Sequence, residues 1–230
     1  MRIIRNDKMI QRNAKIGAFT SLGGLAVLVA GLVVSFSKPE LVTYAWGALL
    51  LGFILTQVGL YFGNRWGRKP RPDELLDAGL KGLDDRYTIY HYKSPVAHLL
   101  LGPAGIWILL PYQQAGRIVF DKGRWRQKGG GFIQGYMRIF AQEGLGRPDL
   151  DVVADLDAMR KFIKKFLPDR ESPDIQTALV MTNEKAEIDV EDPPTPIVAL
   201  KKLKDLIRKT AKEKGLSATQ IQEIQNVLPE

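Results

Sequence analysis

Cysteine is absent from this chain of 230 residues, and histidine occurs only as His91 and His98. The absence of cysteine excludes disulfide bonds, thiolate nucleophiles and cysteine-ligated zinc, and it fits a reducing cytoplasm. Two histidines without cysteine or an accompanying carboxylate pair make a poor zinc set. We therefore expect strand histidines that are satisfied by a neighbouring group, and we expect no metal site and no cofactor.

Excess charge is also absent from most of the chain, although the formal net charge is +8. Residues 73–230 hold 23 Lys and Arg against 23 Asp and Glu. The excess lies in two short segments, residues 1–15 and residues 64–72, each with a net charge of +4. A neutral body exerts no long-range attraction on a polyanion, so the total charge does not by itself indicate a nucleic-acid-binding protein.

The chain does contain two long apolar runs. Residues 16–36 and residues 41–63 carry no charged side chain, and only residues 37–40 separate them. At about 1.5 Å per residue, each run is long enough to cross a hydrocarbon layer about 30 Å thick. The runs predict two transmembrane helices that form a hairpin over residues 16–63, with both outer ends on the same side of the membrane.

The charged segments beside these runs predict the orientation of the hairpin. Cations concentrate on the cytoplasmic side of membrane proteins. Residues 1–15 are therefore expected to be a basic cytoplasmic N-terminus, residues 64–72 a basic linker and residues 73–230 a cytoplasmic domain, in a multi-pass protein of the bacterial inner membrane. The lipid bilayer is then a partner, and the cations would attract its anionic headgroups. A cleaved signal peptide is the alternative for the first run, but its apolar core would be shorter, and a second span would not follow it.

The first part of residues 73–230 predicts one helix and then strands. Leucines at helical spacing predict a helix over residues 73–83. A period of two then predicts strands at residues 86–92, 97–102, 105–111 and 116–121, in a mostly antiparallel meander, with a hairpin partner at residues 124–127. Residues 128–149 contain six glycines and predict a long excursion.

The second part predicts further helices around a buried strand. Amphipathic spacing predicts a helix over residues 150–167, with Val153 and Phe166 on its apolar face. A buried strand over residues 175–182, a loop at 189–196 and a short strand at 197–200 follow. A basic helix over residues 201–214 precedes a last helix that begins with a capping box of Ser217 and Gln220. This order predicts an α/β (α+β) fold, with a mixed central sheet flanked by helices.

Residues 82–125 also carry a recognisable set of framework residues. In chain order these are Gly102, Gly105, Gly116 and Trp125. With them, residues 72–125 resemble the nuclease-related domain family, whose fold is similar to the PD-(D/E)xK restriction-endonuclease core. The resemblance implies a restriction-endonuclease-like sheet, with Glu74 in the place of a glutamate that the family carries on a helix.

The catalytic positions that the resemblance implies are degenerate in this chain. The metal-binding aspartate of the family aligns with Ala97, and its Glu-x-Lys pair aligns with Leu110 and Tyr112. Such chemistry needs two carboxylates to hold Mg²⁺ and a lysine beside the attacking water or the developing phosphate charge. Alanine and leucine offer no oxygen, and a tyrosine hydroxyl is not a cation at neutral pH. The resemblance therefore implies an inactive member of the family.

Two other arrangements stay open. An active site relocated to Glu74, Asp84, Asp85 and Lys93 is one, although Asp84-Asp85 also suits a turn and Lys93 a loop. The other is a nucleic-acid- or anion-binding surface made of cations interleaved with aromatic residues, which equally suits a solvated hairpin face. The cations of this surface are Arg117, Lys122, Arg124, Arg126 and Lys128.

The favoured function is a membrane-anchored, catalytically inactive scaffold or protein-binding module at the cytoplasmic face, with a protein partner or a membrane complex. The alternative is a membrane-associated nucleic-acid-binding protein or a residual metal-dependent nuclease.

Overall fold

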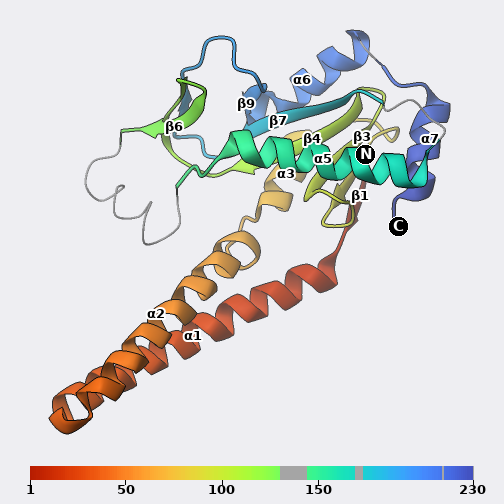
Figure 1. Ribbon diagram of the computed structural model, residues 1–230. Coiled ribbons are helices and arrows are strands. Elements are labelled where there is room, and N and C mark those ends of the chain that lie inside the picture. Colours follow the sequence, from red (N-terminus) through yellow and green to blue (C-terminus); the bar gives the residue numbers. More distant parts are fainter. Residues whose placement is uncertain (130–143, 169–172, 214, 230) are drawn as a thin grey trace. The chain divides into compact units, whose positions relative to one another are not determined.

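The computed structural model describes residues 1–129, 144–168, 173–213 and 215–229 (Figure 1). These residues divide into two compact units. One unit is a helical hairpin, Asp7–Arg71, and the other joins Met1–Asn6 to the described residues from Pro72 onward. Most of the predicted excursion at residues 128–149 lies outside the described residues.

The hairpin consists of two long helices, as the apolar runs predict. Helix α1 is Asp7–Ser37, a short 3-10 turn η1 is Pro39–Leu41, and helix α2 is Val42–Phe62. One π-helical turn, η2 at Gly63–Gly67, ends the hairpin. Helix α1 begins well before the apolar run because residues 7–15 continue the same helix with polar side chains.

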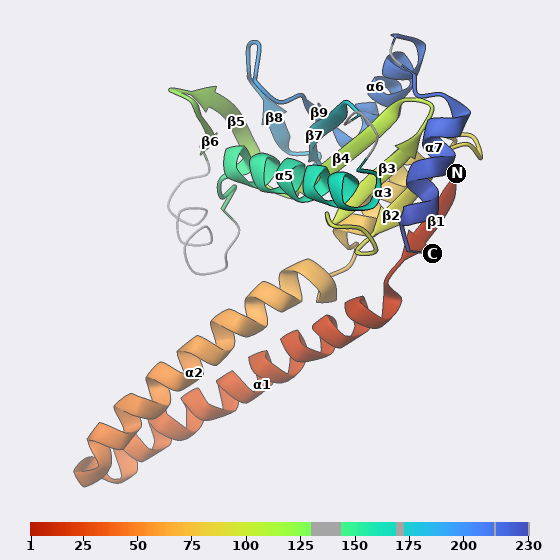
Figure 2. The same cartoon turned by 45° about the vertical axis from the view of Figure 1, so that its right-hand side comes forward.

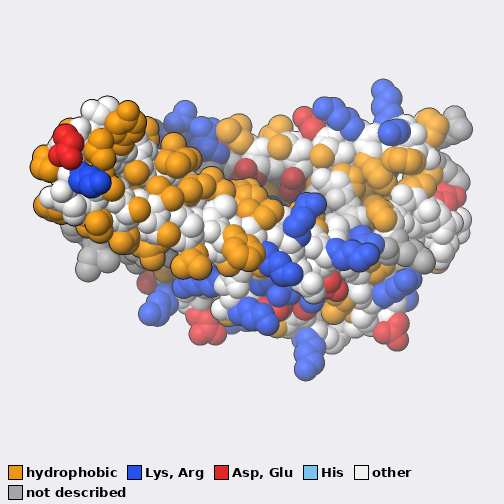
Figure 3. All heavy atoms as spheres, turned by 90° about the horizontal axis from the view of Figure 1, so that it is seen from below, with side chains coloured by type: hydrophobic (Ala, Val, Ile, Leu, Met, Phe, Trp, Pro, Cys, Tyr) orange, Lys and Arg blue, Asp and Glu red, His pale blue; other side chains and the backbone are white. Residues whose placement is uncertain are grey.

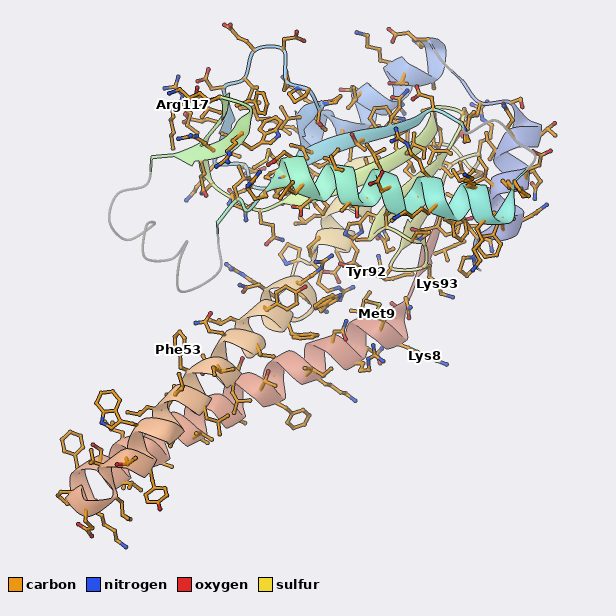
Figure 4. All side chains as sticks on the ribbon, in the orientation of Figure 1. Lys8, Met9, Phe53, Tyr92, Lys93 and Arg117 are labelled. Carbon is orange, nitrogen blue, oxygen red and sulfur yellow. The ribbon has the colours of Figure 1, made fainter. Side chains whose placement is uncertain are left out.

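The two helices pack through their smallest side chains. Within the apolar runs the buried positions recur every seven residues and are Gly17, Gly24 and Gly31 on α1, and Ala45, Gly52 and Gly59 on α2. A Cβ atom at Gly24 would lie 2.8 Å from the backbone nitrogen of Thr56, so only glycine permits this approach. Large apolar side chains point the other way: Phe19 is 73% exposed and Phe36 is 80% exposed. Figure 3 shows these hydrophobic side chains over the surface of the hairpin, and Figure 4 shows Phe53 projecting outward from α2.

The α/β domain is built on a mixed sheet of six strands. In spatial order these are β1 (Arg2–Arg5), β2 (Thr88–His91), β3 (His98–Gly102), β4 (Gly105–Tyr112), β7 (Ile175–Met181) and β9 (Ile197–Ala199). Strands β2, β3 and β4 form the predicted antiparallel meander. The outer pairs, β1 with β2, β4 with β7 and β7 with β9, are parallel.

The structure corrects the predicted division at residue 15. Residues Arg2–Arg5 are not part of a separate basic tail, because they form β1 and pair with Thr88–His91 in the domain sheet. Only Asn6 stands between β1 and α1. The predicted linker at 64–72 is also shorter, since η2 extends the hairpin to Gly67 and the next helix begins at Pro72.

A second correction concerns the fourth strand of the predicted meander. Strand β5 (Gly116–Asp121) does not continue the sheet, because β7 occupies the free edge of β4 along its length. Instead β5 pairs with β6 (Arg124–Lys128) and with β8 (Ala186–Ile188), a strand that the sequence did not predict. The β5–β6 hairpin is as predicted, and Lys122 and Gly123 both have positive φ in its two-residue turn.

Helices cover both faces of the six-stranded sheet (Figures 1 and 2). Helices α3 (Pro72–Leu80) and α6 (Leu200–Glu213) pack on one face, and α5 (Pro148–Phe166) and α7 (Ala218–Val227) pack on the other. The predicted capping box of Ser217 and Gln220 begins α7. One detail of α5 is wrong in the prediction, since Val153 and Phe166 are exposed and the buried side is narrower. The chain therefore joins an α/β domain to two long apolar helices.

The hairpin packing makes a prediction with an internal control. Replacing Gly24 with valine forces α1 away from the backbone of α2, whereas the neighbouring Gly23 has open space around it. We expect Gly24→Val to lower the unfolding free energy of the purified full-length chain by about 1–3 kcal/mol. Gly23→Val is expected to leave it nearly unchanged. Thermal unfolding followed by circular dichroism measures both, and equal melting temperatures for the two variants would rule out glycine-mediated contact.

Candidate functional site

The positions that the predicted resemblance aligns with catalytic residues lie at β3 and β4. Ala97 stands just before β3, where its carbonyl oxygen accepts a hydrogen bond from the Tyr92 N–H at 2.8 Å. Leu110 is buried on the face of β4 that packs against α5. Neither side chain carries an oxygen atom, so neither position can ligate a metal ion.

Tyr112 is the residue that the predicted resemblance aligns with a lysine. Its hydroxyl donates a hydrogen bond to the Asp151 carboxylate of α5 at 2.8 Å. Burial raises the pKa of Tyr112, and the hydrogen bond to Asp151 raises it further. The phenol therefore stays neutral well into the alkaline range, and it supplies no positive charge.

Glu74 is not brought to this side of the sheet. It lies in the first turn of α3, which packs on the face opposite α5.

Two of the three framework glycines, Gly102 and Gly105, have a local structural reason for being glycine. A Cβ at Gly102 would lie 2.3 Å from the Tyr87 ring, and Gly105 has a φ of 98°. The framework of the turn between β3 and β4 is thus explained by packing and backbone conformation alone.

The alternative site at Glu74, Asp84, Asp85 and Lys93 does not converge. Asp84 and Asp85 precede β2, whereas Lys93 follows it, so they stand at opposite ends of the strand. Asp84 accepts hydrogen bonds from the Arg86 side chain, which lowers the pKa of that carboxyl. Both side chains of this pair are exposed, as expected for the turn interpretation.

The basic surface of the β5–β6 hairpin is present, but its tryptophan points away from it. Trp125 is buried in the core, with its ring centroid 5.1 Å from that of Phe120. Arg117, labelled in Figure 4, donates a hydrogen bond from Nε to Asp189 at 2.7 Å. The exposed face of β6 is then made by Arg124, Arg126 and Lys128. Nucleic-acid binding at this face stays a prediction, without a stacking platform from Trp125.

A buried polar cluster, which the sequence did not predict, lies where β1, β2, β3 and α3 meet. Arg5 of β1 forms an ion pair from Nε to Asp73 at 2.9 Å and a second ion pair to Asp77. Asp73 is fully buried, and Arg5 and Asp77 are mostly buried. Two carboxylates of α3 thus hold Arg5, the last cation before the hairpin helix α1.

The two histidines of the chain complete this cluster. His91 and His98 face each other across β2 and β3, with their Nδ1 atoms 2.8 Å apart. His91 Nε2 lies 2.9 Å from the Asp77 carboxylate, so this nitrogen donates and the carboxylate accepts. The expectation of strand histidines satisfied by a neighbour is confirmed for His91.

A sequence signal for this cluster existed. Asp73 and Asp77 share a helical stripe with the core leucines Leu76 and Leu80, at spacings of three and four residues. Two carboxylates on the buried stripe of a helix require a buried cation. Arg5 could not be identified as that cation, because nothing local indicates that β1 pairs with a strand more than 80 residues away.

The contacts of this cluster join β1 to α3 and to β2. Within the described parts of the chain, no group of three or more His, Asp or Glu side chains could hold a metal ion. Asn6 strengthens the same junction, because its backbone N–H donates to the His91 carbonyl at 3.0 Å and its side chain donates to the Tyr92 carbonyl. The cluster fixes β1, and with it the entry to α1, onto the domain.

Fold and site together define a chain with two long, apolar N-terminal helices followed by a mixed α/β sheet domain. Comparisons with protein-family models, with curated proteins and with solved structures find no match to this chain.

The buried cluster predicts that loss of Asp73 lowers the unfolding free energy. The exposed pair of Asp84 and Arg86 provides the control. Asp73→Asn leaves Arg5 partly unpaired in a buried site, and breaking such a pair costs about 3–5 kcal/mol of unfolding free energy. Asp84→Asn removes an exposed partner of Arg86, and we expect little change. Urea unfolding of the full-length chain measures both, and a similar midpoint for the two variants would mean that Arg5 does not fix β1.

Proposed function

We propose that α1 and α2 span a membrane and hold the α/β domain at its cytoplasmic face as a non-catalytic, nuclease-related scaffold. The single observation that carries the membrane part is the inverted packing of the hairpin. Glycines fill the contact between the helices, while large apolar side chains face outward. In water this arrangement would expose apolar surface along two long helices, whereas lipid is the solvent that suits it.

A soluble core helix and a cleaved signal sequence are the rivals of this proposal. A core helix is mostly buried, but only 11% of the apolar window of each helix is buried here. Removal of α1 by cleavage would also separate β1 from the domain and leave Asp73 and Asp77 without Arg5. The buried cluster therefore supports a hairpin that is retained.

The pairing of β1 with β2 supports a hairpin with both ends on one side. Residues before α1 and residues after α2 belong to the same folded sheet, so both lie on the same side of a membrane. A chain that enters the membrane through α1 must therefore return through α2. The cations of residues 1–15 and 64–72 favour the cytoplasmic side for this end.

Aromatic side chains mark both ends of α2. Tyr44 and Trp46 are near its start, and Tyr61 and Trp66 are at its end. About 26 Å separates Tyr44 from Tyr61 along a helix that rises about 1.5 Å per residue. Tyrosine and tryptophan favour the two interfaces of a bilayer whose hydrocarbon layer is about 30 Å thick.

The nuclease-related part of the proposal is supported by the order of the elements. A helix with Glu74, the strand at Ala97, the Gly102–Gly105 turn, the strand with Leu110 and Tyr112, and a hairpin with Trp125 follow one another as in the family. The loss of oxygen ligands and of the lysine favours a retained fold without metal-dependent cleavage. A scaffold that binds a protein partner is the role that such a domain can still fill.

Membrane insertion is tested by placing a charge on the outward face. Leu25 is 56% exposed and Phe53 is 47% exposed, and both lie near the middle of their helices. In lipid each aspartate costs about 2.5–3.5 kcal/mol, so we expect the Leu25→Asp/Phe53→Asp variant to move from the membrane pellet into the alkaline-carbonate supernatant. Val153→Asp, at an equally exposed apolar site on α5, is the control that stays in the pellet. A wild-type chain that stays in the supernatant without detergent would refute the proposal.

The inactive-scaffold part is tested with the purified full-length chain, Mg²⁺ or Mn²⁺, and single- or double-stranded DNA and RNA. We expect no cleavage. Metal-dependent cleavage that Glu74→Ala abolishes would instead establish a residual nuclease. Salt-dependent binding of single-stranded DNA, lost in an Arg124→Gln/Arg126→Gln/Lys128→Gln variant, would favour the nucleic-acid-binding alternative. A stoichiometric protein that co-purifies in mild detergent would favour the scaffold.

A further inference from the structure

One face of α1 changes from cationic to apolar along its length. Lys8, Arg12 and Lys15 are exposed and follow one another at intervals of four and three residues, so they form one stripe. Asp7 is the only acidic residue of α1. Figure 4 shows Lys8 projecting from the first turn of this helix.

This cationic stripe lies about 180° around the helix from the glycines that pack against α2, given about 100° per residue. It therefore stands on the outer face of the hairpin. The same face continues with Phe19, Leu22 and Val33, which are all more than half exposed. The side chains that would touch lipid tails and the three cations thus share one surface.

The lengths of the two parts match the layers of a bilayer. From Ile16 to Phe36 the helix rises about 30 Å, which is the thickness of the hydrocarbon layer. The cationic stripe before it covers about 10 Å, so it crosses a headgroup layer of about 5–8 Å on that side of the bilayer. At the corresponding end of α2, the Arg65 guanidinium lies 5.1 Å from the ring centroid of Trp66. Cation and aromatic ring together are typical of the interface.

From this we infer that Lys8, Arg12 and Lys15, with Arg65, form a binding surface for the headgroups of anionic phospholipids. The inference rests on the proposed membrane span and adds the class of lipid that the anchor selects. Lipid is favoured over an acidic protein or a nucleic acid because the cations share their helix face with the outward apolar side chains. Headgroups of the surrounding lipids therefore lie within reach of the cations at all times.

The test uses the full chain with Trp46→Phe, so that Trp66 is the tryptophan at the membrane surface. It is reconstituted into phosphatidylcholine bilayers that contain a small, equal fraction of nitroxide-labelled phosphatidylglycerol or nitroxide-labelled phosphatidylcholine. The ratio of tryptophan quenching by the two labelled lipids reports the preference for the anionic headgroup. Each cation near an anionic surface contributes about fivefold, so we expect a clear preference for phosphatidylglycerol that weakens at high salt.

Two triple variants with the same change in charge decide the result. Lys8→Gln/Arg12→Gln/Lys15→Gln is expected to reduce the preference at least tenfold, since three cations are removed at about fivefold each. Lys201→Gln/Lys202→Gln/Lys212→Gln, on the exposed side of α6, is expected to leave it unchanged. Equal quenching by the two labelled lipids in the protein with the unaltered stripe would overturn the inference. An equal loss of lipid preference in the two triple variants would also overturn it. Absence of quenching by either lipid overturns the membrane span itself, so the two failures are distinguishable.

Discussion

The pairing of β1 with β2 brings chain segments from before and after the hairpin into one sheet. Four residues before the hairpin join β2, which lies after the hairpin in the chain, and Arg5 secures them to Asp73 and Asp77 of α3. The domain is therefore attached to the hairpin at two points, with one residue between β1 and α1 and a short segment between η2 and α3.

The two units bury different kinds of side chain, and this difference supports the membrane proposal. In the domain, large apolar side chains such as Trp107 and Ile108 are fully enclosed between sheet and helices. In the apolar runs of the hairpin the enclosed positions are glycine and alanine, and phenylalanine and leucine face outward. The same hydrophobic effect produces both patterns if water surrounds the domain and lipid surrounds the hairpin. Within the domain, Leu110 is part of the packed core, and the Tyr112 hydroxyl is a neutral hydrogen-bond donor to Asp151.

Much of the fold could be predicted because its signals are local. The apolar runs, the amphipathic pattern of α5, the turn at Lys122-Gly123 and the capping box at Ser217 each lie within one segment of chain. Strand β1 could not be predicted, since four residues show no clear period and its partner is more than 80 residues away. The buried cluster could not be predicted for the same reason, because Arg5, Asp77 and His91 come from three separate segments of the chain. Strand β5 was assigned to the wrong sheet because the sequence does not reveal that β7 takes the edge of β4. For the candidate site, the identities of Ala97, Leu110 and Tyr112 were readable, but their burial and the contact with Asp151 were not.

Labelling of introduced cysteines tests whether the hairpin crosses the membrane and returns, because the chain has no cysteine of its own. Single cysteines are introduced at Ser37, beside the turn of the hairpin, and at Lys202, on the exposed side of α6. Intact bacterial cells expressing either full-length variant are then treated with a membrane-impermeant maleimide. We predict that Ser37→Cys is labelled from outside and that Lys202→Cys is labelled only after the cells are opened. Labelling of both from outside, or of neither until lysis, would contradict a hairpin that crosses the membrane and returns.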